Sequence, residues 1–268
     1  MHSVINKASK TPGIRRLVKW WTQFRISQFA KQEEQRRKQD NKNLMNFEFS
    51  KFSQNGEDGI IEEIFKRIGT SNKYFVEFGI ENGQECNCRW LVENNGWQGL
   101  WIDGGAENIR QAKEHYQNYP VTLAEHFIDK DNIVEIFNKY QVPQEFDLLS
   151  IDIDGNDYWV WESLKSFQPR VVIMEYNGSY FPHEEWVMPY NPKHRFNSTA
   201  NYGASLRSYE ALGRQLGYRL IGCDSAGVNA FFVHEKFADN FSHNAAGAEY
   251  HYVCPKFRNL SIGWPRLS

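Results

Sequence analysis

The sequence predicts an α/β fold built on a mostly parallel, doubly wound sheet that ends in an antiparallel hairpin. Apolar runs alternate with helix-length segments along most of the chain, which is typical of βαβ units. The last two runs are separated by only four residues, and so short a connection permits only antiparallel pairing, because a parallel crossover needs about a dozen residues or more. The expected strands are residues 74–78, 100–103, 121–127, 146–153, 171–176, 218–223 and 228–234, with a short helix over 59–68 before the first.

The charge distribution divides the chain into a basic head and an acidic body. A length of 268 residues fits one α/β domain with appendages. Residues 1–45 hold 11 basic and 3 acidic residues, which leaves 20 basic and 30 acidic residues in the remainder. We therefore expect a basic amphipathic helical extension over 1–45, a main domain over 46–240 and a C-terminal tail over 241–268. An acidic main domain argues against a general nucleic-acid-binding surface.

Apolar residues in the basic extension recur at steps of three and four, which places them on one face of a helix. Basic residues flank this face, so the helix could lie on an anionic membrane surface. Packing on the main domain and pairing with a second copy of the chain are the alternatives. The segment 10–30 thus predicts peripheral membrane contact or a homo-oligomer. The apolar residues are Ile14, Leu17, Val18, Trp21 and Phe24, and the basic ones are Arg15, Arg16, Lys19 and Arg25.

Cysteine spacing and hydropathy predict a cytoplasmic protein, with contact at the inner membrane face if the extension binds lipid. Every apolar run is interrupted by a charged residue before it reaches the roughly 18 residues that span a bilayer. The cysteines form no C-x-x-C pair and follow no secretory signal, so we expect reduced thiols rather than a disulfide framework or a zinc site. They are Cys86, Cys88, Cys223 and Cys254.

Two neighbouring strand ends carry acids where an α/β sheet binds ligands. Glu77 ends the first strand and opens a turn with Gly79 and Gly83, and Asp103 follows 26 positions after Glu77. An acid about 20 positions past a glycine turn can accept hydrogen bonds from both ribose hydroxyls of an adenosine. Glu81 and Glu85 would repel a pyrophosphate but favour a sulfonium and an ammonium group. The pattern therefore favours S-adenosylmethionine over a dinucleotide.

Two further strand ends carry oxygen ligands. Asp152 and Asp154 share one face at the tip of the fourth strand, and Glu175 and Asn177 should project together from the fifth. Oxygen atoms that converge from two strand tips could hold Mg²⁺ or Mn²⁺. We expect Asp154, Glu175 and Asn177 to supply the ligands. The alternative is that these groups cap helices or bond to the acceptor.

The segment 178–205 is rich in proline, histidine and aromatic residues and follows the fifth strand. Long loops without secondary structure of their own are usually lids or binding loops, so we expect this one to cover the acceptor. His183 or His194 could remove a hydroxyl proton, because unperturbed histidine titrates near pH 6.5. Our catalytic candidates are Asp154, Glu175 and His183.

Six motifs follow one another along the chain: S-Q-N-G-E-D at 53–58, F-V-E-F-G at 75–79, E-C-N at 85–87, L-V-E at 91–93, G-W-Q-G-L at 96–100 and I-D-I-D-G at 151–155. This ordered series resembles the FkbM-type S-adenosylmethionine-dependent methyltransferases, and the likeness runs from about Phe52 to His234. The resemblance implies a Rossmann-like class I methyltransferase fold with a seven-stranded sheet, and O-methylation of a hydroxyl on a sugar, polysaccharide or secondary metabolite. It also implies that Glu77, Gly79 and Gly83 line the methionine half of the cofactor and that Asp103 binds its ribose. Gln54, Asn87 and Asp152 complete the expected cofactor site.

Two other functions fit parts of the same pattern. A metal-dependent glycosyltransferase would use Asp152 and Asp154 to hold a cation and a nucleotide sugar, but it does not require the acid-bearing glycine turn at Glu77. A non-catalytic scaffold would use the basic helix to recruit partners and the sheet only to bind a ligand. Ligand binding and the effect of substitutions at Asp154 and Glu175 separate these hypotheses.

Overall fold

The computed structural model describes residues 39–196, 199–242 and 245–255. Residues from Lys42 onward form one unit. The helix that we predict within the N-terminal extension lies outside the described residues, as does the end of the C-terminal tail.

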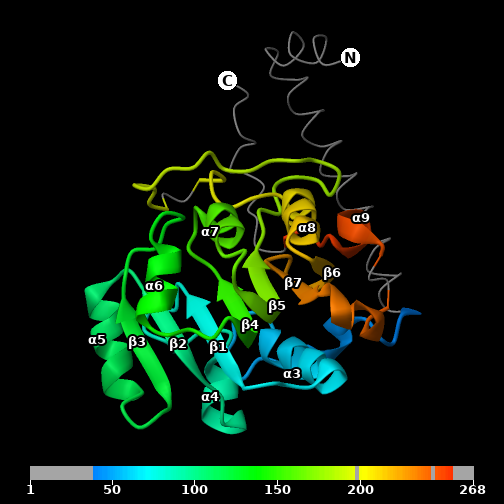
Figure 1. The fold of residues 1–268 in the computed structure, drawn as a ribbon. Helices are drawn as coiled ribbons and strands as arrows, with labels where there is room; N and C mark the ends of the chain where they lie inside the picture. Colours follow the sequence, from blue (N-terminus) through cyan, green and yellow to red (C-terminus); the bar gives the residue numbers. More distant parts are fainter. Residues whose placement is uncertain (1–38, 197–198, 243–244, 256–268) are drawn as a thin grey trace, which may run out of the picture. The chain divides into compact units, whose positions relative to one another are not determined.

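A single seven-stranded sheet runs through this unit in the order β3-β2-β1-β4-β5-β7-β6 (Figure 1). The first five strands in this order are parallel, and β7 is antiparallel to both β5 and β6. The predicted parallel sheet with a terminal hairpin is therefore confirmed. The strands are β1 (Tyr74–Phe78), β2 (Gln98–Asp103), β3 (Val121–Glu125), β4 (Glu145–Ile151), β5 (Gln168–Glu175), β6 (Tyr218–Cys223) and β7 (Asn229–His234).

Helices cover both faces of the sheet (Figure 1). One face is covered by α3, α4 and α5, which share one hydrophobic cluster with the adjoining strands. The other face is covered by α6, α7 and α8. No helix in the described ranges has the length and apolar composition that crossing a membrane requires. The helices are α3 (Glu57–Ile68), α4 (Arg89–Asn95), α5 (Ala106–His115), α6 (Ile133–Lys139), α7 (Asp157–Ser163), α8 (Leu206–Gln215) and α9 (Gly247–His251), with short 3-10 helices at Leu44–Phe47 and Glu235–Asn240.

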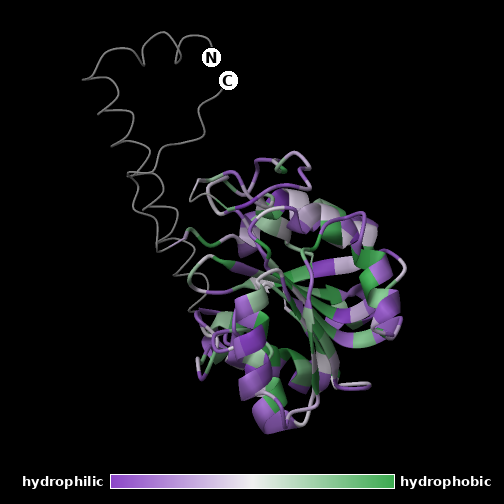
Figure 2. Ribbon diagram, turned by 90° about the vertical axis from the view of Figure 1, so that its left-hand side faces the viewer, coloured by the Kyte–Doolittle hydropathy of each residue, from purple (hydrophilic) through white to green (hydrophobic). Residues whose placement is uncertain are grey.

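The central strands form the core because both of their faces are covered. From Phe146 to Ile151 every residue of β4 is buried, as expected for a strand of a parallel sheet with both faces covered, and the buried Asp147 accepts hydrogen bonds from backbone N–H groups before β1. Figure 2 shows apolar strands in the interior and hydrophilic residues on the outer surfaces of the helices. Because β1, β2, β4 and β5 are parallel, the turns that follow these strands all lie at the same edge of the sheet.

The register of the sheet brings the acids at the strand ends together. Glu77 pairs with Trp101 on β2 and with Ser150 on β4, so the ends of these three parallel strands are level. At the antiparallel neighbour, Glu175 pairs with Asn229. The carboxyl edge of the sheet is therefore the place where the functional side chains meet.

Candidate active site

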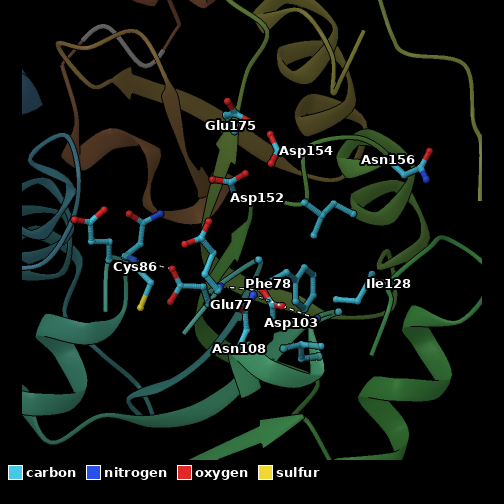
Figure 3. Close-up of a pocket in the computed structure, with 18 of the residues that line it drawn as sticks. Glu77, Phe78, Cys86, Asp103, Asn108, Ile128, Asp152, Asp154, Asn156 and Glu175 are labelled. Carbon is cyan, nitrogen blue, oxygen red and sulfur yellow. Dashed lines mark hydrogen bonds between the residues drawn. The ribbon is translucent and has the colours of Figure 1, made fainter. Parts of the chain in front are cut away.

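A cavity of about 540 Å³ opens at the carboxyl edge of the sheet (Figure 3). Glu77 and Asp103 lie toward one end of it, and Asp154 and Glu175 lie toward the other. The structure brings most of the predicted site residues to this cavity but not Gly83, Asn177 or His183. The predicted residues that line it are Gln54, Glu77, Gly79, Asn87, Asp103, Asp152, Asp154 and Glu175.

The carboxylate of Glu77 holds the loop that follows β1. Its Oε1 accepts a hydrogen bond of 2.7 Å from the Asn87 backbone N–H, and its Oε2 accepts bonds from the Cys88 N–H (3.1 Å) and the Trp101 indole (2.8 Å). Burial raises the pKa of the Glu77 carboxyl, and these hydrogen bonds oppose the rise. Glu77 lines the cavity, as predicted, but its oxygens are engaged by the protein, so it shapes the site rather than offering a free charge.

The glycine turn after β1 requires residues without side chains. Gly79 has a φ of 72°, and a Cβ there would overlap the Asp152 carbonyl oxygen at the tip of β4. Gly83 has a φ of 76°, and a Cβ there would lie 2.9 Å from the Tyr116 ring. The Tyr116 hydroxyl also donates to the Gly83 carbonyl at 2.6 Å. Gly79 thus allows the turn after β1 to lie close to the turn after β4, and it lines the cavity. Gly83 instead packs against Tyr116, at the end of α5, and does not line the cavity.

Asp103 connects the glycine turn to the start of α5. Its Oδ2 accepts a hydrogen bond from the Glu81 N–H (2.8 Å), and its Oδ1 accepts from the Gly105 N–H (2.7 Å) and the Asn108 amide (3.1 Å). Glu81 has a φ of 49°, which its bond to Asp103 stabilises. With 9% of its surface exposed, Asp103 reaches the cavity from a fixed position.

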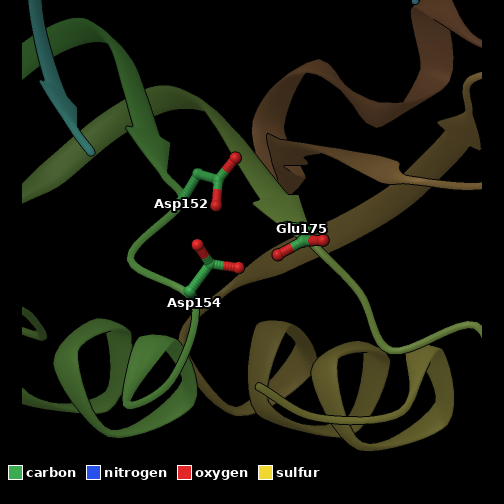
Figure 4. Close-up of side chains that lie close together, drawn as sticks. All are labelled: Asp152, Asp154 and Glu175. Atoms are coloured by element: carbon green, nitrogen blue, oxygen red, sulfur yellow. The ribbon is translucent and has the colours of Figure 1, made fainter. Parts of the chain in front are cut away.

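Three carboxylates form the other end of the cavity, and we call Asp152, Asp154 and Glu175 the acidic triad. One oxygen of each lies within 4.8 Å of the others (Figure 4). Asp157 fixes the turn from below, because its carboxylate accepts 2.8 Å hydrogen bonds from the Ile153 and Gly155 N–H groups. Burial, together with the neighbouring carboxylates, raises the pKa of Asp152 and Glu175 well above the ordinary range and raises that of Asp154.

Asn177 does not join this cluster, which corrects the predicted ligand set. Its buried amide donates to the Ala200 and Tyr202 carbonyls at 2.8 and 3.0 Å, and its amide oxygen accepts from the Ser179 N–H at 3.1 Å. The prediction extended strand alternation past Glu175, but β5 ends there. Asp152 takes the place that we assigned to Asn177.

The two histidines of the loop differ in position. The His183 ring stacks on Phe181 with a centroid distance of 6.0 Å, and His183 is not among the residues that line the cavity. His194 lines the cavity, and its Nε2 lies 3.0 Å from the Asp154 carbonyl oxygen. A Cβ at Gly155 would overlap the His194 ring, so the ring can occupy this position only because residue 155 is a glycine. Of the two histidines, His194 is therefore the one that faces the cavity.

Several lining residues have no signal in the sequence. Arg195 packs its guanidinium 3.5 Å from the centre of the Phe127 ring, at the same end of the cavity as Asp103. Only the tertiary structure brings loop 178–205 to the end of β3, so no spacing could have indicated this contact. Of the predicted polar residues, Asn87 donates to the Ser150 hydroxyl at 3.0 Å and Gln54 donates to Glu85 at 3.4 Å. The polar or aromatic lining residues that we did not name as site residues from the sequence are Asn55 and Glu57 of the S-Q-N-G-E-D motif, Phe78, Asn108, His126, Phe127, Asn156, Arg195 and Asn229.

Comparison with known proteins adds a family match. A family model described as the methyltransferase FkbM domain matches residues 34–220. A comparison with curated proteins finds no match.

Distant likenesses to solved structures accompany this match. The chain is similar to the N-terminal domain of EvdMO1, solved with SAH and D-fucose (12% identity, 66% of this chain and 82% of that chain, TM-score 0.44). It is also similar to an S-adenosylmethionine-dependent methyltransferase from Clostridium acetobutylicum (11% identity, 66% of this chain and 89% of that chain, TM-score 0.43). A third similar structure is CalS10, an amino pentose methyltransferase from Micromonospora echinaspora (9% identity, 66% of this chain and 89% of that chain, TM-score 0.42).

Proposed function

We infer, because this chain belongs to the family of FkbM methyltransferases, that it transfers a methyl group from S-adenosylmethionine to a hydroxyl of a sugar, polysaccharide or secondary metabolite. Its seven-stranded sheet has the Rossmann-like class I methyltransferase fold. The observation that carries the proposal is the pairing of the Gly79 turn with Asp103 at adjacent strand ends on one cavity. This arrangement suits an adenosine-containing ligand.

The charge of the cavity supports this cofactor over a dinucleotide. Eight of the described residues that line it are acidic, whereas Arg195 is the one lining residue with a permanent positive charge. Such a cavity attracts a ligand that carries sulfonium and ammonium groups and repels a diphosphate. Gln54, Asn55 and Asn87 supply the amide groups that can bond to the ligand's carboxylate.

The protein's main task in methyl transfer is alignment. S-adenosylmethionine supplies a methyl group bound to a positively charged sulfur, which needs no further activation. Asp154 and Glu175 lie at the acceptor end of the cavity and orient the hydroxyl that is to be methylated. Holding the reacting atoms in line accounts for much of the rate enhancement in such a transfer. His194 faces the same space and gives the acceptor a further polar contact.

Ligand binding tests the proposal and separates it from its alternatives. Isothermal titration calorimetry should show binding of S-adenosylmethionine and of SAH, and both ligands should raise the melting temperature. NAD and nucleotide sugars with Mn²⁺ should produce neither effect. Binding of a nucleotide sugar in place of S-adenosylmethionine would favour the glycosyltransferase hypothesis, and the absence of any heat with S-adenosylmethionine would refute our proposal.

Product formation tests the catalytic part. SAH release in the presence of a panel of monosaccharides and their glycosides should exceed the release without acceptor. Mass spectrometry of cell-surface glycans with and without the gene should show a difference of one methyl unit. Undiminished biological activity of an Asp154→Ala, Glu175→Ala double variant would instead support the scaffold hypothesis.

The site of action is a separate proposal. We propose that the protein works in the cytoplasm and that residues 10–30 hold it at the inner membrane face. Flotation of the full chain with anionic liposomes should exceed that of a version that lacks residues 1–45. Equal flotation of the two would remove the membrane contact and leave packing or oligomerisation as the role of the extension.

A further inference from the structure

The acidic triad differs from Glu77 and Asp103 in having no basic or backbone donor among the described residues. Glu77 and Asp103 each accept three hydrogen bonds. Within residues 39–196, 199–242 and 245–255, no Lys or Arg forms an ion pair with Asp152, Asp154 or Glu175, and their carboxylate oxygens accept no backbone N–H. Three carboxylates that share one site cannot all stay ionised without a counter-charge.

Their geometry suits a shared ion. Asp152 and Asp154 come from the turn after β4 and Glu175 from the end of β5, and their carboxylates point toward a common space (Figure 4). One oxygen of each lies within 4.8 Å of the others. Oxygens on opposite sides of an ion are about 4.2 Å apart around Mg²⁺ and about 4.8 Å apart around Ca²⁺. Carboxylate oxygens are also the ligands that hard divalent cations prefer.

A second observation concerns a buried tyrosine hydroxyl near the triad. Tyr209 on α8 is fully buried, and its hydroxyl has no hydrogen-bond partner in the part of the chain that the structure describes. Burial, followed by the charges of Asp157, Glu175 and other nearby groups, raises the pKa of this hydroxyl well above its usual range.

The Tyr209 hydroxyl lies near the end of β5, which carries Glu175. A Cβ at Gly203 would lie 3.2 Å from this hydroxyl and 3.7 Å from the Glu175 carbonyl oxygen. A buried donor without an acceptor is unfavourable by about 1–3 kcal/mol. A buried hydroxyl of this kind calls for a partner that the described residues do not supply, such as an ordered water molecule or an ion.

We propose that Asp152, Asp154 and Glu175 bind one divalent cation of the Mg²⁺ or Mn²⁺ type at the acceptor end of the cavity. The cation neutralises the three carboxylates and presents open coordination positions to the oxygens of the acceptor. This inference rests on the proposed function, since it assigns the triad to the acceptor rather than to the cofactor. It also replaces Asn177 by Asp152 in the ligand set.

Binding of Mn²⁺ to the chelator-treated full chain tests the proposal. Electron paramagnetic resonance follows the loss of free Mn²⁺ signal, and Mg²⁺ is added as a competitor. We expect one site that Mg²⁺ displaces, and we expect Glu175→Gln and Asp152→Asn to weaken Mn²⁺ binding at least about tenfold. The matched control is Glu85→Gln, which removes an exposed carboxylate of the same cavity. Glu85 is not among the charges that shift the pKa values of the triad, so this variant should leave Mn²⁺ affinity unchanged.

Two results would overturn the proposal. One is an unaltered signal of free Mn²⁺ when the wild-type chain is added at low-millimolar ion concentration. The other is an equal loss of Mn²⁺ affinity in Glu85→Gln and Glu175→Gln. That result would indicate that the acidic cavity attracts Mn²⁺ without a defined site. Circular dichroism verifies that each variant is folded. Calorimetry with S-adenosylmethionine on the same samples distinguishes the two inferences, because we expect the triad variants to keep their cofactor affinity.

Discussion

Replacement of Glu77 by glutamine should destabilise the protein although it removes a buried charge. Glutamine has one acceptor oxygen, so it can keep the bonds from Cys88 and Trp101 only as weaker, neutral hydrogen bonds. Its NH₂ group would then face the Asn87 N–H, and that bond is lost. Glu85→Gln is the matched control, because Glu85 is exposed and accepts a single 3.4 Å bond from Gln54.

The size of the effect follows from these three contacts. A hydrogen bond to a charged group contributes about 1.5–3 kcal/mol and a neutral one about 0.5–1.5 kcal/mol. Two weakened bonds and one lost bond therefore cost about 4 kcal/mol. Removal of the buried charge also relieves its desolvation, which offsets part of this loss. The expected net destabilisation is about 2–3 kcal/mol.

Thermal unfolding followed by circular dichroism measures this difference. For a domain of this size about 2–3 kcal/mol corresponds to a decrease in melting temperature of about 4–12 °C. S-adenosylmethionine affinity should also fall about tenfold, because the loop that carries Asn87 loses its anchor. A Glu77→Gln melting temperature equal to that of Glu85→Gln would refute the reasoning, since the three hydrogen bonds would then contribute nothing net.

Three further substitutions test other parts of the site. Gly79→Ala should abolish measurable S-adenosylmethionine binding in calorimetry, whereas the far-ultraviolet circular dichroism spectrum should stay unchanged. An alanine in the left-handed conformation costs about 1–2 kcal/mol, and its Cβ would push the tip of β4 away. Retained affinity for S-adenosylmethionine would contradict this reasoning. Asp103→Ala should weaken the same binding by about 100-fold, since the glycine turn and α5 lose their common acceptor, and an unchanged dissociation constant would exclude that role. Tyr209→Phe should raise the melting temperature of the metal-free protein by a few degrees, as an unsatisfied donor is removed. That gain should shrink when Mn²⁺ is added, and an equal gain in both conditions would contradict the position that we give to this hydroxyl.

The sheet was predictable because its signals are local. Apolar runs of strand length and the short connection between the last two of them determine strand number and direction without knowledge of the rest of the chain. Differences are confined to strand ends. The run 121–127 was expected to be a strand throughout, but β3 ends at Glu125, and Phe127 instead forms part of the cavity wall.

The site was predictable only where it depends on strand ends. Asp103, Asp152 and Glu175 lie where the sequence placed them, because a parallel sheet brings the carboxyl ends of its strands to one edge. Asn177 and His183 lie beyond the strands, where the chain path is set by contacts such as the bonds from Asn177 to the segment around residue 200. No periodicity encodes such contacts, so their positions could not be deduced from spacing.

The hydrogen bonds of the cavity acids distinguish two roles that look alike in the sequence. Glu77 and Asp103 end strands just as Asp152 and Glu175 do, yet the first two are saturated by donors from the loops that they hold. The second two face each other without a basic or backbone donor, so their repulsion is relieved only by a proton that they share or by a cation. An acid that organises a loop contributes to stability in the absence of ligand, whereas an acid of the triad contributes only when the cavity is filled. The same residue type at equivalent strand ends therefore builds the cofactor end of the cavity and leaves the acceptor end in need of a cation.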